Sequence, residues 1–108
     1  MPTYKKLVRD RIPEIIEATG KSFTIETLTN EQYIIELKRK LHEELKEFEE
    51  AETNLDALEE LADLLELLHA ASRVLGFTPD HLEKIRQEKE IERGAFHQKL
   101  FLIEVEDD

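Results

Sequence analysis

Apolar residues recur every three or four positions along most of this chain, which is typical of amphipathic helices. Two long stretches show the pattern, residues 30–52 and residues 55–75. Thr29 and Gln32 have the spacing of a capping box just before the first stretch, and Gly76 ends the second. The pattern therefore predicts two long helices joined by a short break, which makes them antiparallel neighbours.

Shorter elements surround this pair. Residues 10–19 predict a short helix with Asp10 as its N-cap, and a third helix is expected over residues 79–92 after a threonine and a proline. Apolar and β-branched residues alternate with polar ones over residues 22–28, and residues 96–105 are rich in aromatic and β-branched side chains. Both segments predict short strands that could pair with each other.

The predicted fold class is mostly α, with two long antiparallel helices, a third helix and small β decorations, in a single domain over residues 1–108. Leucine and alanine cover more than half of the wheel of residues 55–75. A second apolar flank on that wheel consists of Leu58, Leu61, Leu65 and Leu68. One neighbouring helix cannot cover so wide a surface. A second chain that completes a four-helix core is expected, with the third helix as the competing cover.

Composition limits the partners. The chain has 26 acidic and 15 basic residues, a formal net charge of −11, and no cysteine. Phosphate and anionic lipid repel such a surface, which argues against large nucleic acids and membranes as partners. The N-terminus has no apolar core of a secretory signal, and no apolar run approaches the length of a membrane span. We therefore expect a cytoplasmic protein.

Four acids occupy unusual places on the two long helices. At about 100° per residue, Glu44 and Glu60 fall in the middle of the apolar stripe of their helices, with Glu47 and Asp63 at its edges. An unpaired buried carboxylate costs several kcal/mol. Residues three apart on a helix are neighbours, so each pair can converge on one cation. Four oxygen ligands favour Mg²⁺, or Mn²⁺, over zinc.

Two other interpretations compete with this site. Acids on helices are commonly solvated or engaged in salt bridges, which is the interpretation we adopt for Glu43, Glu59 and Glu66. Helical bundles also build di-iron sites from Glu-x-x-His, a spacing that Glu66 and His69 share. That pair points away from Glu60 on the wheel and has no second copy in the sequence, so a di-iron centre is disfavoured.

The acidic motifs also carry a family resemblance. Glu44-x-x-Glu47 followed by Glu60-x-x-Asp63 resembles the ExxE…ExxD signature of the MazG-like all-α nucleoside triphosphate pyrophosphohydrolases. The flanks KLHEE (residues 40–44) and ELADLLE (residues 60–66) are similar to that family too. KLVRDRIP (residues 6–13) and KEIERGAF (residues 89–96) resemble its house-cleaning or phosphoribosyl-ATP pyrophosphohydrolase-like branch, which more often has a second glycine at position 95. The resemblance covers nearly the whole chain.

The resemblance implies Mg²⁺-dependent hydrolysis of a nucleoside triphosphate between the α and β phosphates, giving a monophosphate and pyrophosphate, in a homodimer or homotetramer. It implies Glu44, Glu47, Glu60 and Asp63 as metal ligands. The substrate class expected is non-standard nucleotides, with phosphoribosyl-ATP of histidine synthesis as the alternative. A non-catalytic helical interaction protein remains the alternative outside the enzymes.

Two roles follow from placing that chemistry on these residues. One carboxylate could accept the proton of the attacking water, and Glu47, at the edge of the stripe, is favoured over Glu44. Basic groups must offset the negative field around a polyanionic substrate. The candidate phosphate-binding residues are Arg9, Lys84, Lys89 and Arg93.

Overall fold

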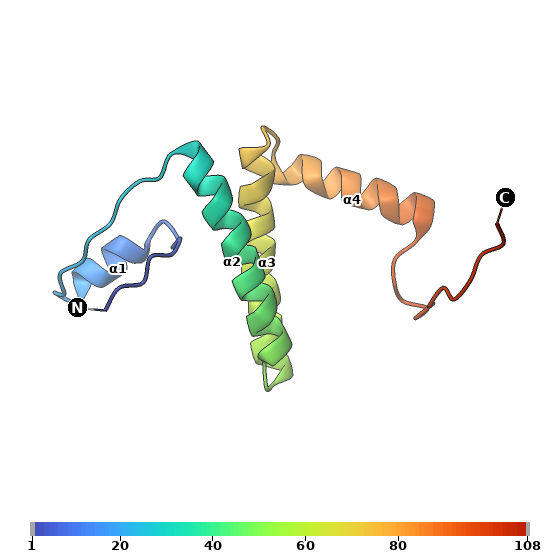
Figure 1. Cartoon of the computed structure of the whole chain (residues 1–108), viewed down its shortest axis with the longest axis horizontal. Coiled ribbons are helices and arrows are strands. Elements are labelled where there is room, and N and C mark those ends of the chain that lie inside the picture. Colours follow the sequence, from blue (N-terminus) through green and yellow to red (C-terminus); the bar gives the residue numbers. More distant parts are fainter. Residues whose placement is uncertain (1, 108) are drawn as a thin grey trace.

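The computed structural model describes residues 2–107 and contains four helices (Figure 1). They are α1 (Ile12–Ala18), α2 (Asn30–Glu50), α3 (Asn54–Val74) and α4 (Pro79–Arg93). The predicted mostly helical class, with two long helices followed by a third, is confirmed. None of these helices is both long and apolar enough to cross a lipid bilayer.

Each of the three longer helices has a threonine as its N-cap residue. At the start of α2, the Thr29 hydroxyl accepts a hydrogen bond from the Gln32 backbone N–H at 3.2 Å, and the Thr29 N–H donates to the Gln32 side chain at 3.1 Å. The predicted capping box is therefore present. Thr53 and Thr78 cap α3 and α4 through single bonds of the same kind. These caps place the turns that bring α2 and α3 together.

The start of α1 differs from the prediction. The helix begins at Ile12, its N-cap is Arg11, and no side chain caps it. Asp10 is not the N-cap because the chain already turns there: the Ile12 N–H donates to the Arg9 carbonyl at 3.1 Å. This turn leaves Asp10 outside the helix.

The two predicted strands are corrected by the structure. Neither residues 22–28 nor residues 96–105 form a strand, and within residues 2–107 there is none. A strand needs a neighbour to pair with its backbone groups. The two segments lie on opposite sides of the α2–α3 hairpin and so cannot pair within the chain as it is arranged (Figure 1). Strand-like composition was therefore insufficient to predict a sheet.

The core of the single chain lies between α2 and α3 and is thin. Leu37, 3% exposed, is the only buried hydrophobic residue in the described part of the chain. The helix α4 leads away from the hairpin (Figure 1) and leaves the second apolar flank of α3 uncovered. The radius of gyration is 18.5 Å, against roughly 13 Å for a compact domain of this length. The third helix is therefore not the cover of that flank.

Candidate functional site

Five carboxylates gather where α2 and α3 face each other. Carboxylate oxygens of Glu44, Glu60 and Asp63 lie within 4.8 Å of one another, and so do those of Glu43, Glu44 and Glu47. The two groups share Glu44, which is 7% exposed. The spacing of one helical turn within each helix and the packing of the hairpin bring these oxygens together. The predicted inward position of Glu44 is thus confirmed, and Glu47 lies at the exposed edge.

The inner oxygens of this acidic cluster lack partners. The Oε2 atoms of Glu44 and Glu60 are buried and have no hydrogen-bond donor among the described residues. Burial, above all, and then the neighbouring Glu60 and Glu47 carboxylates raise the pKa of Glu44 to about 7. A proton shared with Glu60 would satisfy one oxygen in the metal-free protein. Divalent cations satisfy the same need, so the donor set fits Mg²⁺ or Mn²⁺.

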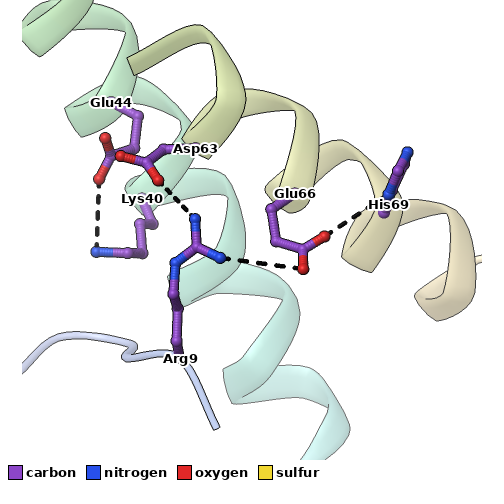
Figure 2. A network of polar contacts seen from close by, with 6 residues as sticks. All are labelled: Arg9, Lys40, Glu44, Asp63, Glu66 and His69. Atoms are coloured by element: carbon purple, nitrogen blue, oxygen red, sulfur yellow. Dashed lines mark hydrogen bonds and ion pairs between the residues drawn. The ribbon is translucent and has the colours of Figure 1, made fainter. Parts of the chain in front are cut away.

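Basic side chains surround the cluster on its open side. Figure 2 shows Arg9 reaching from the N-terminal segment between the two helices. Its guanidinium donates to Asp63 at 2.5 Å and lies 4.0 Å from Glu66. Lys40 lies 3.8 Å from Glu44 on the same helix, with its side chain largely buried. Of the predicted phosphate-binding residues, Arg9 alone is brought to the cluster.

The other three predicted phosphate-binding residues, Lys84, Lys89 and Arg93, lie on α4. This helix extends away from the hairpin (Figure 1), so within one chain the structure does not bring them to the acidic cluster. Arg86, which lies between them, pairs with Glu83 at 2.6 Å and Glu90 at 2.7 Å. The charge of Arg86 is therefore paired with acids of the same helix, and these ion pairs raise the pKa of its guanidinium.

Sequence reasoning did not predict the positions of three residues at this site. Lys40 was not considered, although its position four residues before Glu44 was a signal that the two would meet. Lys6 lies 3.5 Å from Glu43, a contact that no local spacing indicates. Glu43 was predicted to be solvated or engaged in a salt bridge, and its contact with Lys6 agrees with that prediction. Its half-buried position in one of the two carboxylate groups was not predicted.

The competing di-iron interpretation finds no support in the described residues. Glu66 pairs with His69 at 3.6 Å, as their spacing predicts (Figure 2). Neither residue takes part in a group of three potential metal ligands within residues 2–107. The pair lies beside the Arg9 contact and away from Glu44. Any metal chemistry is therefore expected at the acidic cluster.

Comparisons with known proteins add little to this geometry. The chain is 48% identical over 54 residues to an uncharacterized protein of Mycolicibacterium smegmatis. The match covers 50% of this chain, and the chain spans about half of that relative's length, 55%. No family model matches the sequence, and no solved structure matches it. The function must therefore be argued from the site.

Proposed function

We propose that the chain is a Mg²⁺-dependent nucleoside triphosphate pyrophosphohydrolase that cleaves between the α and β phosphates. The observation that carries the proposal is the acidic cluster around the buried Glu44, with two buried, unpartnered carboxylate oxygens on facing helices. Like charges buried together are costly unless a cation lies among them. The resemblance of the same motifs to MazG-like enzymes supplies the reaction, with non-standard nucleotides as the expected substrates.

In this proposal Glu44, Glu60 and Asp63 hold the metal, with Glu47 completing the set from the edge. A bound Mg²⁺ neutralises charge on phosphate oxygens and lowers the pKa of a bound water. Glu47 is exposed and so is placed to accept the proton of the water that adds to the anhydride. The products are a nucleoside monophosphate and pyrophosphate.

Arg9 and Lys40 are the basic residues positioned for the substrate's phosphates. Both contact the ligand carboxylates in the structure, so they stand where a phosphate bound to the cluster would lie. Arginine is well suited to this role because its fork donates two parallel hydrogen bonds. Lys84, Lys89 and Arg93 take part only if another chain brings α4 to the cluster.

We also propose association into a homodimer or homotetramer through the leucine face, defined as Leu58, Leu61, Leu65 and Leu68. These side chains are between 44% and 61% exposed on α3. The single chain exposes 10266 Å², against roughly 6,200 Å² for a compact protein of its mass. The excess is large enough for an extensive interface. A second pair of long helices would complete a four-helix core.

The test of the activity is pyrophosphate release with Mg²⁺ from a panel of nucleoside triphosphates and phosphoribosyl-ATP. Glu44→Gln and Glu60→Gln should abolish release, whereas Glu49→Gln and Glu59→Gln, exposed acids on the same two helices, should leave it unchanged. A preference for phosphoribosyl-ATP would assign the alternative substrate. No release from any of these compounds by the unmodified chain would overturn the proposal.

A non-catalytic helical protein is the second candidate, favoured by the ion pairs that Arg9 and Lys40 make with the cluster. In that case the carboxylates serve as salt-bridge partners. Mg²⁺ would then neither bind nor raise the melting temperature, and Glu44→Gln would destabilise the fold. Titration with Mg²⁺ alone separates the two candidates without a substrate.

A further inference from the structure

Two extended segments of the chain expose apolar side chains and have no backbone partner among the described residues. One covers residues 21–28 and the other residues 100–107. Phe101 is 86% exposed and Ile103 77%, while Ile25 on the other segment is 54% exposed. An apolar, strand-like segment with free backbone groups is a ready template for pairing with another chain.

The local backbone sets where both segments begin and where the first one ends. Gly20, with φ of 80°, precedes the first, and Lys99, with φ of 58°, precedes the second. Both values lie outside the extended region, so a ladder can begin only after these residues. The capping box at Thr29 ends the first segment. The first segment thus offers residues 21–28, and the second is described from residue 100 to residue 107.

In one antiparallel register the side chains of the two segments match, with position 21 opposite 107 and position 28 opposite 100. This register places apolar residues opposite one another, as in Phe23–Val105, Ile25–Ile103 and Leu28–Leu100. It also sets Lys21 opposite Asp107, which pairs opposite charges. A shift of one residue would set Phe23 opposite Glu104 and lose the match. Cross-strand pairs of these kinds stabilise a ladder.

The two segments cannot meet within the chain as it is arranged. They lie on opposite sides of the α2–α3 hairpin, along the longest dimension of a molecule that measures 62 × 36 × 25 Å (Figure 1). A second copy of the chain presents both segments again. We therefore propose that residues 100–107 of one copy add as an antiparallel strand to residues 21–28 of another copy, in the register given above.

This exchange adds to the association through the leucine face and does not depend on the proposed chemistry. Neither segment carries a carboxylate of the acidic cluster. A two-stranded ribbon alone is marginal in water and needs an apolar surface to cover it. Packed helices of the associated chains would provide that surface. If the experiments below fail to show the strand exchange, the pyrophosphohydrolase proposal is unaffected.

Disulfide trapping tests the register, because the chain has no cysteine of its own. Chains with Ile25→Cys are co-expressed with chains carrying Ile103→Cys, and Thr24→Cys with Glu104→Cys, since only one of two successive pairs has the shorter spacing. We expect covalent dimers from at least one pair after mild oxidation, identified by mass spectrometry of the linked peptides. Ile25→Cys with Val105→Cys, a diagonal pair, is the control and should link at least several-fold less.

Two results would overturn the exchange. One is equal or no linkage across the in-register pairs compared with the diagonal control. The other is that the double variant Ile25→Cys/Ile103→Cys closes a disulfide within one chain and migrates as a monomer, which would assign the pairing to a single chain.

A second measurement avoids cysteine. Ile103→Asp places a charge on the apolar face of the ladder, whereas Glu104→Gln alters only the opposite face. In light scattering with size exclusion, Ile103→Asp should weaken association by about tenfold or more, with unchanged helical circular dichroism. Glu104→Gln should match the unmodified chain. Equal masses for all three proteins across a dilution series would contradict the proposal.

Discussion

The guanidinium of Arg9 donates a hydrogen bond of 2.5 Å to the carboxylate of Asp63, across 54 positions of sequence. The contact joins the N-terminal segment to the middle of α3 (Figure 2), and carboxylate oxygens of Asp63, Glu44 and Glu60 lie within 4.8 Å of one another. Arg9 therefore occupies an oxygen that a metal ion would use, and it places a positive charge next to the proposed metal position. Two opposite effects of removing Arg9 follow.

Arg9→Ala should tighten the binding of free Mg²⁺ and weaken turnover. Loss of a nearby positive charge should lower the Mg²⁺ dissociation constant by about three- to tenfold, as measured by calorimetry. Loss of the guanidinium proposed to bind the substrate's phosphates should lower kcat/KM by about tenfold or more. Arg11→Ala is the control, because Arg11 pairs with Glu14 away from the cluster. Unchanged Mg²⁺ affinity in Arg9→Ala would show that the ion does not bind at Asp63.

The raised pKa of Glu44 makes the metal-free protein sensitive to pH. Its pKa is about 7 in the folded chain, above the ordinary value of 4.5 for a glutamate, so the folded state binds more protons than the unfolded state between these pH values. The contribution of Glu44 to the free energy of unfolding is therefore fully present below pH 4.5. It is lost as the pH rises through 7, which lowers the free energy of unfolding by about 3 kcal/mol. Urea unfolding in EDTA across this range measures the loss.

Glu44→Gln should abolish this decline, because glutamine does not titrate. Glu49→Gln, an exposed acid on the same helix, should retain it. A decline that persists unchanged in Glu44→Gln would assign the titration to other groups.

Mg²⁺ should stabilise the fold through the acidic cluster. A ligand present at 100 times its dissociation constant adds about 2.7 kcal/mol, which for a domain of this size raises Tm by roughly 10 °C or more. Calorimetric melting with and without Mg²⁺ measures the shift. Glu60→Gln should lose most of it, and Glu59→Gln, its exposed neighbour, should keep it. A shift of equal size in both variants would place the ion elsewhere.

The leucine face should control association. Leu65 is 52% exposed in the single chain, so Leu65→Asp costs little within that chain but buries a charge in any interface that covers α3. Sedimentation should show that the dissociation constant of the self-association rises by about tenfold or more, while the helicity is retained. Glu59→Gln again serves as the control. An unmodified chain that sediments as a monomer at tens of micromolar would contradict the proposed association.

Local signals in the sequence were sufficient for the helices. The Thr29 capping box and the threonine before α4 fall where sequence reasoning placed them, because a cap depends only on residues within one turn. The burial of Glu44 was equally predictable, since a helical wheel requires no knowledge of the partner helix. The metal ligands and the reaction proposed for them stay predictions.

Contacts between distant segments were beyond such reasoning. Residues 22–28 and 96–105 have the composition of strands, but whether they pair depends on where the helices carry them. Lys6 and Arg9 meet Glu43 and Asp63 only because the N-terminal segment folds across the hairpin.

The sequence by itself determined the helices, the caps of α2 and α4 and the inward position of Glu44, because these follow from periodicity and from interactions within a turn. The tertiary structure decided that α4 leaves the leucine face open, that Arg9 and Lys40 border the acidic cluster, and that no strand forms within residues 2–107. These outcomes depend on the directions in which the connections send each element, and short-range preferences do not encode those directions.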